Sequence, residues 1–296
     1  MPHESRSVGE VEITPLCDMV ADFPRPFARA FPTIPTERHD EFRARYPENF
    51  RGPEAWQMHD HCYAVRSAGA LLLVDTGVGD RDTLGAQWFR TTGGLPSELE
   101  AVGLAPNDVD VSVITHAHLD HIGWNLDRSG DAVEPRFPNA RYVVQRAEWE
   151  GFPSAGDDDD RVAFDQSMAP LEALGVLHLV DGEHRIADGV TVQLAPGHTP
   201  GHQVVVAESR GERAVLSGDL ANHPAQVSEP RWATGSDQDP EVAATTRAEW
   251  FDAVEQWNAM LCTAHFADPF ARLVRKDGQR FLAGNPGVDP NRNRET

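Results

Sequence analysis

The stretch VSVITHAHLDHIGWN, residues 111–125, decides how the rest of the sequence is interpreted. A short apolar run leads directly into three histidines and one aspartate: His116, His118, Asp120 and His121. Polar groups placed directly after a buried strand cost free energy unless they find hydrogen-bond partners or a metal ion. Imidazole and carboxylate together suit Zn, Mn, Fe, Co or Ni, and no cysteine lies beside the cluster to add a thiolate. The stretch therefore predicts a metal site.

Other strand ends supply candidate ligands for the same site. One short segment rarely saturates a metal ion, and polar residues follow apolar runs again at Asp75, His198, Asp219 and His265. Strand ends on one rim of a sheet are where α/β proteins gather their sites. We divide the seven predicted ligands into two groups that share one bridging carboxylate: His116, His118 and His198 for one ion, Asp120, His121 and His265 for the other, and Asp219 between them. Two ions about 3.5–4 Å apart with open positions for water form a hydrolytic centre.

Hydrophobic periodicity predicts short strands alternating with helices, as in an α/β protein. The predicted strands cover residues 8–14, 63–66, 70–75, 111–115, 141–145, 176–180, 190–194, 203–207, 214–216 and 261–264. The predicted helices cover residues 95–102, 147–150, 161–174 and 241–260. The acidic run at residues 157–160 is expected to be a solvated loop.

The first 57 residues differ in composition from those that follow. Between residues 18 and 53, proline recurs among five phenylalanines. Proline at this density interrupts regular structure, whereas phenylalanine favours burial. We therefore expect an arm over residues 1–57 that packs on a catalytic domain over residues 58–283. The Gly-, Pro- and Asn-rich residues 284–296 are expected to be disordered.

Composition and net charge indicate which classes of molecule the protein is expected to bind. The chain of 296 residues is 40% hydrophobic and 25% charged, as in ordinary globular proteins. Its formal net charge of −21 opposes nucleic-acid binding and favours a small neutral or weakly charged substrate. No apolar run approaches the roughly 18 residues of a membrane span, and the N-terminal MPHESRSVGE lacks the apolar core of a signal peptide. Three scattered cysteines predict free thiols, so we expect a cytoplasmic protein, with a homodimer as one possible state.

Four motifs together resemble the ordered signature of the metallo-β-lactamase-fold hydrolases. They are HAHLDH at residues 116–121, APGHTPGH at 195–202, SGD at 217–219 and TAHF at 263–266. The resemblance runs from about Tyr63 to His265, in the order that is typical of the family. It implies an αββα sandwich with a two-metal site at one edge of two packed sheets. It also implies that Asp75 supports the metal-binding loop from behind the ligands, a place that His202 fits as well.

Asp219 and Asn222 help to distinguish which subgroup of this family the sequence resembles. β-Lactamases of this fold typically place Cys or Ser where Asp219 lies, and nucleases of the fold usually carry basic surfaces, so neither activity fits. The proline-rich extension and residues 231–247 look more like the lactonase and methyl-parathion-hydrolase branch. Quorum-quenching lactonases carry a tyrosine three residues after the bridging aspartate, where this chain has Asn222. Acyl-homoserine lactones are therefore less favoured than other lactones, esters or phosphotriesters.

The resemblance implies hydrolysis of a small molecule by a hydroxide held between two divalent ions, with zinc favoured over manganese, iron, cobalt or nickel. Asp120 is the predicted catalytic residue, which orients the attacking oxygen, accepts its proton and passes a proton to the leaving group. Asn222, His223 and Trp124 are the predicted pocket residues. Two alternatives stay open. One is a non-hydrolytic metal-binding or redox module on the same fold, and the other is a glyoxalase II-like thioesterase, although no basic helical region follows His265.

Overall fold

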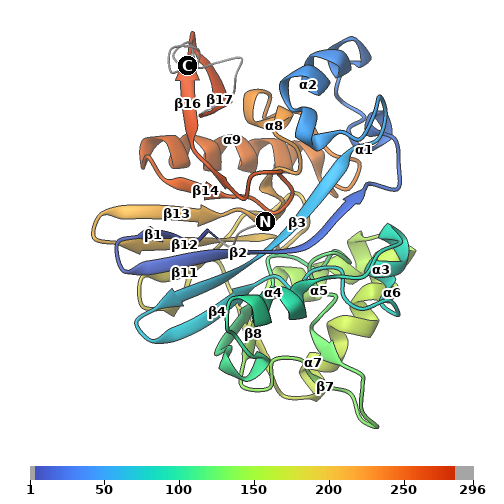
Figure 1. Cartoon of the computed structure of the whole chain (residues 1–296), viewed down its shortest axis with the longest axis vertical. Coiled ribbons are helices and arrows are strands. Elements are labelled where there is room, and N and C mark those ends of the chain that lie inside the picture. The colour runs from blue at the N-terminus through green and yellow to red at the C-terminus, as the bar shows by residue number, and fades with distance from the viewer. Residues whose placement is uncertain (1–3, 284–296) are drawn as a thin grey trace.

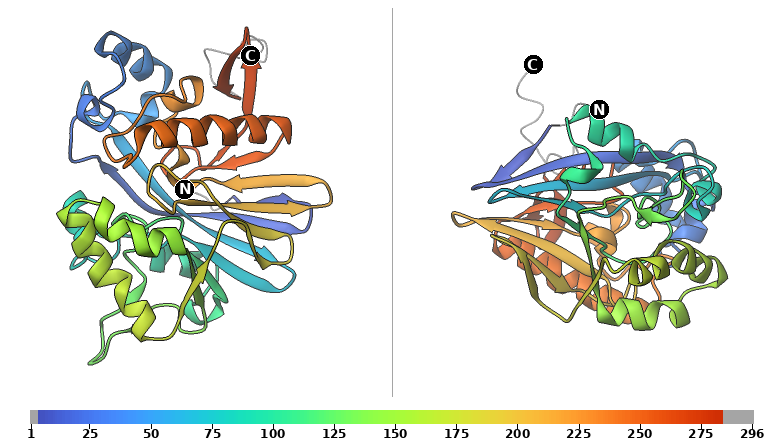
Figure 2. Two further views of the ribbon diagram at one scale, coloured as in Figure 1. Left: turned by 180° about the vertical axis from the view of Figure 1, so that it is seen from behind. Right: turned by 90° about the horizontal axis from the view of Figure 1, so that it is seen from below.

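Two β-sheets pack face to face in the computed structural model, which describes residues 4–283, and helices cover both outer faces (Figure 1). Figure 2 shows the blue N-terminal sheet and the yellow sheet as separate layers, with the orange helix α9 (Pro240–Gln256) against the yellow one. This arrangement is the αββα sandwich that the resemblance implied, so the predicted fold class is confirmed. The predicted disordered tail, residues 284–296, lies outside the described residues.

The first sheet changes from antiparallel to parallel pairing at its centre. Its strands lie in the spatial order β1 (Arg6–Val8), β2 (Val11–Asp22), β3 (Gln57–Ser67), β4 (Ala70–Val74), β5 (Val111–Val113), β8 (Arg141–Gln145) and β9 (Leu177–Val180). Pairing is antiparallel up to β4 and parallel from β4 onward. Because β4 and β5 run parallel, with Val74 opposite Val113, the chain leaves both strands at the same edge. Asp75 and the histidine-rich loop therefore start side by side.

The second sheet delivers its polar residues to the site in the same way. Its strands lie in the order β10 (His184–Ala187), β11 (Val190–Leu194), β12 (Gln203–Ser209), β13 (Glu212–Leu216), β14 (Met260–Cys262) and β15 (Phe270–Ala271). All neighbours pair antiparallel except β13 and β14, which run parallel with Leu216 opposite Cys262. The segments after these two strands carry Asp219 and His265, so both residues emerge at one edge.

Aliphatic side chains fill the space between the sheets and beneath the helices. Val65, Val113, Val192 and Val205 are fully buried members of the core between the sheets. A separate core joins α9 to the second sheet through Phe251, which is also fully buried. β-Branched residues pack well on pleated surfaces. The continuous apolar run in β12 is buried on both faces, because Val205 belongs to the core between the sheets and Val204 and Val206 belong to the core beneath α9.

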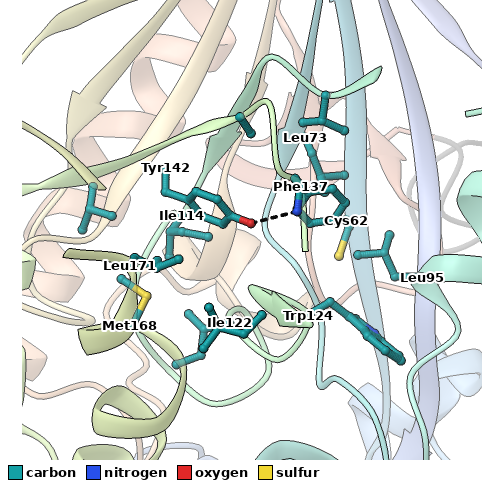
Figure 3. Close-up of a cluster of buried hydrophobic side chains, with 14 of the residues drawn as sticks. Cys62, Leu73, Leu95, Ile114, Ile122, Trp124, Phe137, Tyr142, Met168 and Leu171 are labelled. Carbon is teal, nitrogen blue, oxygen red and sulfur yellow. Dashed lines mark hydrogen bonds between the residues drawn. The ribbon is translucent and has the colours of Figure 1, made fainter. Parts of the chain in front are cut away.

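A third core lies between the first sheet and the helices over it (Figure 3). Figure 3 shows Tyr142 of β8 among apolar side chains such as Leu171. The Tyr142 hydroxyl donates to the carbonyl of Asn125 at 2.9 Å and accepts from the backbone N–H of Phe137 at 3.2 Å. Tyr142 is fully buried, so its phenol satisfies two backbone groups of the chain that follows the metal-binding loop.

We expect Tyr142→Phe to lower the free energy of unfolding by about 1–3 kcal/mol, because two buried backbone groups lose their partner. Urea denaturation followed by fluorescence measures this change. A loss below about 0.5 kcal/mol, the range of neutral surface substitutions, would contradict the assigned hydrogen bonds.

Residues 23–56 form a segment, here called the arm, that packs against the site end of the sandwich. Its helices are α1 (Phe27–Ala30) and α2 (His39–Arg45), with 3₁₀ turns at Thr36–Arg38 and Pro47–Asn49. Its aromatic rings surround the buried imidazole of His223, with centroids of Phe27, Phe31, Tyr46, Phe50 and Trp56 within 6.4 Å. The arm is also fastened by backbone contacts, since the N–H of Gly235 donates to the carbonyl of Ala30 at 2.7 Å.

The predicted arm over residues 1–57 included two strands of the first sheet. Residues 8–14 do not form one strand, because the chain turns at Gly9 and continues as β2 to Asp22. β2 accommodates Pro15 because β1 pairs only with Val11–Ile13, which leaves the later part of β2 at a sheet edge. Whether residues 1–57 and 58–283 are separate units stays a prediction.

The acidic run at residues 157–160 is not a loop, which corrects the expectation from the sequence. Asp157 caps helix α6 (Asp158–Ser167), because its carboxylate accepts from the N–H groups of Asp159 and Asp160. Acidic residues are stabilised at a helix N-terminus by the exposed N–H groups and the helix dipole. The predicted helix over residues 161–174 is also divided, because Pro170 opens a separate helix, α7 (Ala169–Ala173).

The other elements are short. They are α3 (Leu84–Phe89), α4 (Leu95–Ala101), α5 (Arg146–Ala155), α8 (Ala225–Ser228), 3₁₀ turns at Pro106–Asp108 and Gly218–Leu220, the pair β6 (Leu126–Asp127) and β7 (Glu134–Pro135), and the hairpin β16 (Leu273–Lys276) and β17 (Gln279–Leu282). Within residues 4–283, no helix has the length and apolar character that a membrane crossing requires.

Candidate metal centre

The seven predicted ligands meet at one edge of the sandwich in the two groups that the sequence suggested. The first group contains His116, His118, His198 and Asp219, and the second contains Asp120, His121 and His265. Within each group the candidate ligand atoms lie within 4.8 Å of one another. All seven residues are buried. The chain thus brings together side chains from four separate segments, which is the arrangement that two neighbouring metal ions need.

Asp219 lies between the groups with one oxygen directed to each. Its Oδ2 is 3.2 Å from Nε2 of His198, whereas its Oδ1 is 3.2 Å from Nε2 of His121 and 2.9 Å from Nε2 of His265. A carboxylate in this position is able to bind two cations at once. Asp120 approaches only the second group, with Oδ2 3.7 Å from Nε2 of His265.

Three of the imidazoles are held by contacts to Nδ1, so that their Nε2 atoms face the centre. Nδ1 of His121 contacts Asp75, Nδ1 of His198 contacts Asp237, and Nδ1 of His265 contacts the carbonyl of His59, each at 2.8–2.9 Å. Carboxylates and carbonyls that hold the far nitrogen of a histidine ligand fix its tautomer and orientation. These contacts leave Nε2 free to bind a metal.

Unpartnered buried atoms show that a metal fits these residues. Nε2 of His116, His121 and His265 and Oδ1 of Asp219 are buried without a hydrogen-bond partner among the described residues. Orphaned buried polar atoms are rare in folded proteins, and here four of them converge. A divalent cation in each group would satisfy them, with ligand types that suit zinc.

The charges at the centre are balanced by opposite neighbours. Burial would raise the pKa of Asp219, but nearby His265 and His121 hold it well below its usual range. Burial also opposes protonation of His198, yet the hydrogen bonds that its ring donates to Asp219 and Asp237 raise its pKa to about 9. Burial lowers the pKa of His116 well below its usual value, and His121 adds to this effect. The centre therefore attracts positive charge while keeping ligand-competent groups.

Asp75 supports the histidine-rich loop, in the position that the resemblance implied. Its Oδ1 accepts from the N–H of Thr115 at 2.7 Å, and its Oδ2 accepts from the Thr115 hydroxyl at 2.8 Å and contacts Nδ1 of His121 at 2.9 Å. The backbone of Asp75 adopts the left-handed region with φ of 60°, which is uncommon outside glycine and typical of functional turns. His202, the other predicted supporting residue, accepts from the N–H of Asp219 at 3.0 Å.

We expect Asp75→Asn to weaken metal binding in the second group by about 10- to 100-fold, because His121 loses its carboxylate partner. Competition with a chromophoric chelator measures the affinity. Asp82→Asn, a change at an exposed aspartate near the same loop, is the matched control and should bind metal as the wild type does. Equal affinities for the two variants would contradict the role of Asp75.

Glu148 is a supporting residue that the sequence did not single out. It lies in α5 and is fully buried. Its Oε1 accepts from the N–H of Ala117, and its Oε2 accepts from the Thr199 hydroxyl and the N–H of Gly201, all at 2.7–2.8 Å. A Cβ on Gly201 would lie 2.0 Å from the backbone nitrogen of Glu148, so only glycine permits this approach. Burial raises the pKa of Glu148 to about 7 although these donors favour its charged form.

We expect Glu148→Gln to destabilise the fold by about 1–3 kcal/mol, because the amide nitrogen cannot accept from the donors that face the carboxylate. Chemical denaturation measures this loss. Glu150→Gln changes an exposed glutamate of the same helix and should leave stability unchanged. If both variants unfold alike, Glu148 does not link the histidine-rich loop to the His198 loop.

Asp237 and Arg247 form a second support that the sequence did not identify. Asp237 Oδ1 contacts Nδ1 of His198 at 2.8 Å, and its Oδ2 accepts from the Arg247 guanidinium at 3.2 Å. Arg247 is fully buried. An isolated aspartate in a polar loop and an arginine in a helix carry no sequence signal for this role, because the pairing exists only once α9 is docked.

A cavity of about 310 Å³ opens over the centre. His118, Asp120, Asp219 and His265 line it at the metal groups. Its apolar wall combines residues of the arm and of the segments that pack on it: Phe23, Trp56, Met58, Trp88, Phe89 and Leu119. This size and lining suit a small molecule.

The three predicted pocket residues have different positions. Asn222 lines the cavity, and its Nδ2 donates to Oδ2 of Asp219 at 2.6 Å. Trp124 does not line it, because its indole N–H donates to Asp18 at 3.0 Å on the far side of the loop. His223 is enclosed by the aromatic rings of the arm and also lies outside the lining. The predictions for Trp124 and His223 are therefore corrected.

Asp160 approaches the centre although its sequence suggested a solvated loop. It lines the cavity, and its Oδ2 lies 3.9 Å from Nε2 of His118. Burial, then repulsion by Asp157, raises the pKa of Asp160 to about 6. The sequence did not single out Asp160, because the neighbouring aspartates are identical residues and differ only in the direction of their side chains.

Comparison with known proteins agrees with this geometry. The sequence profile of the metallo-beta-lactamase superfamily matches residues 58–265. The chain belongs to this superfamily. It is 26% identical over 168 residues to an N-acyl homoserine lactonase of a Bacillus species, covering 52% of this chain and 60% of that protein. It is 37% identical over 121 residues to the N-acyl homoserine lactonase AttM of Azorhizobium caulinodans, covering 39% and 42%. The chain thus spans less than two thirds of the length of these curated relatives.

Solved structures share the fold over nearly the whole chain. AidC, a dizinc quorum-quenching lactonase in complex with a product, superposes with a TM-score of 0.76 at 22% identity, covering 94% of this chain and 96% of AidC. The hydrolase AbOPH of the β-lactamase superfamily superposes with a TM-score of 0.78 at 25% identity, covering 94% and 95%. Both likenesses cover 94% of this chain, which is more than the residues 58–265 that the profile matches.

Proposed function

We propose that the protein is a dinuclear metal-dependent hydrolase that acts on a small lactone, ester or phosphotriester, with zinc as the preferred metal. The observation that carries the proposal is the bridging geometry of Asp219, whose Oδ2 faces Nε2 of His198 and whose Oδ1 faces Nε2 of His121 and His265, which have no hydrogen-bond partner among the described residues. The relatives named as N-acyl homoserine lactonases support a lactone as the first substrate class to test. A cytoplasmic location and a homodimer stay predictions.

The chain's own residues account for substrate orientation and proton transfer. When bound, two divalent ions supply Lewis acidity, polarising the carbonyl or phosphoryl oxygen and lowering the pKa of water. His116, His118 and His198 would hold the first ion and Asp120, His121 and His265 the second, with Asp219 shared. Asp120 lines the cavity, so its carboxylate is placed to accept a proton from the attacking water and return one to the leaving oxygen.

The surrounding side chains determine how the substrate lies. Asn222 holds Asp219 through its Nδ2, and its Oδ1 is buried without a partner among the described residues. Asn222 therefore fixes the orientation of the Asp219 carboxylate at the wall of the cavity. The aromatic wall of the arm excludes water from the apolar part of the substrate, which strengthens the electrostatic interactions at the reacting bond.

We expect chelator treatment or His118→Ala to abolish hydrolysis and Asp120→Asn to lower kcat by about 10²- to 10⁴-fold, the usual effect of removing a general base. The assay compares lactones, aryl esters, thioesters and phosphotriesters with protein loaded with Zn or Mn. His184→Ala changes an exposed histidine of β10 and should retain full activity.

Three outcomes would reject the proposal in different ways. Full activity in metal-free protein, or in His118→Ala, would show that the metal centre is not the reaction site. Two bound metals with no turnover of any member of the panel would favour a non-hydrolytic binding module, and turnover restricted to thioesters would favour a glyoxalase II-like enzyme.

A further inference from the structure

Two arginines line the substrate cavity without an acidic partner. Arg25 and Arg29 of the arm belong to the cavity lining and are exposed. Neither forms an ion pair with any of residues 4–283. The observation is informative because Asp and Glu outnumber Lys and Arg by 47 to 26 in this chain, so an exposed arginine readily finds an acid. These two keep free guanidinium groups where a substrate would enter.

Two acidic residues of the same cavity, Asp157 and Asp160, accept hydrogen bonds from backbone N–H groups at the start of α6. Asp157 Oδ1 accepts from the N–H groups of Asp159 and Asp160 at 3.0 Å, and Asp160 Oδ2 accepts from the N–H of Asp157 at 3.2 Å. All three acids lie at or within the first turn of this ten-residue helix, where its dipole stabilises negative charge. The carboxylates of Asp157 and Asp160 are therefore satisfied by the backbone of α6 rather than by the arginines, and the arginine charges stay available to a ligand.

Packing holds both arginines beside the cavity. The guanidinium carbon of Arg25 lies 5.9 Å from the centroid of Trp88, which also lines the cavity, a distance typical of a cation–π contact. Arg29 belongs to α1, whose Ala30 carbonyl accepts from the N–H of Gly235 at 2.7 Å. Gly235 is another lining residue. The arginines thus lie on a segment that is fastened to the cavity, and they share its lining with apolar rings such as Trp88 and with the metal groups.

We propose that Arg25 and Arg29 determine specificity by binding a carboxylate on the substrate, separated by an apolar spacer from the bond that is cleaved. The proposal rests on the proposed function, because it assigns the reacting end of the substrate to the metal centre. A guanidinium binds a carboxylate through two parallel hydrogen bonds. The substrate class is therefore a lactone or ester with one free carboxylate at its far end, rather than a neutral compound.

Binding of matched carboxylates tests the arginines without relying on turnover. Calorimetry with zinc-loaded protein compares glutarate, adipate and suberate with the monocarboxylates of the same chain lengths. We expect at least one dicarboxylate to bind about 2- to 5-fold more tightly than its partner, the upper part of the range for exposed charge pairs. The preference should disappear in Arg25→Gln/Arg29→Gln and decrease in 1 M NaCl, where the Debye length is about 3 Å. Arg66→Gln, an exposed change outside the cavity lining, should retain it.

Turnover then separates the two proposals. The specificity proposal is overturned if the wild type does not prefer any dicarboxylate, or if Arg25→Gln/Arg29→Gln keeps the preference. It is supported if the double variant raises KM for 4-nitrophenyl hydrogen adipate by a similar factor while 4-nitrophenyl hexanoate is unaffected. An arginine-dependent preference in a protein that hydrolyses no ester or lactone would reject the hydrolase function but retain the carboxylate-binding role.

Discussion

A buried carboxylate between two sets of imidazoles is the contact around which the site end of this protein is arranged. Asp219 is almost fully buried, and an isolated charge in that position would cost many kcal/mol. Histidines from three other segments compensate it, with Nε2 of His265 at 2.9 Å and Nε2 of His121 at 3.2 Å. Every strand that ends near this carboxylate therefore contributes to keeping a negative charge inside the protein.

The ligands are in turn oriented by a second set of buried acids. Asp75 holds the start of the histidine-rich loop, Glu148 joins that loop to the His198 segment, and Asp237 links His198 to Arg247 of α9. Glu148 and Asp237 connect elements from different layers of the sandwich, whereas Asp75 joins the ends of neighbouring strands β4 and β5. The geometry of the centre therefore depends on both sheets and on the helices that cover them. This explains why carboxylates are buried so frequently at this edge, whereas the core between the sheets is aliphatic.

The arm changes the metal centre from an open edge into a shaped cavity. Its aromatic rings pack around His223, and burial lowers the pKa of that imidazole to about 3, so it stays neutral in an apolar setting. The arm thereby supplies an apolar wall together with two unpaired arginines. The metal groups would define the reaction, while the arm would define which molecules reach it.

The sequence alone indicated the layered α/β fold and the seven side chains that the fold brings together. Histidines and aspartates directly after apolar strands cost free energy when buried unless they find hydrogen-bond partners or a metal ion. The sequence did not reveal Glu148, Asp160 or Asp237, since a single acid in a helix or polar loop looks the same whether it faces solvent or a buried site. It also suggested Trp124 and His223 as pocket residues, but Trp124 donates to Asp18 and His223 packs among aromatic rings of the arm, and neither lines the cavity. Only the tertiary structure decided these cases, because the direction of a side chain depends on which element packs against it.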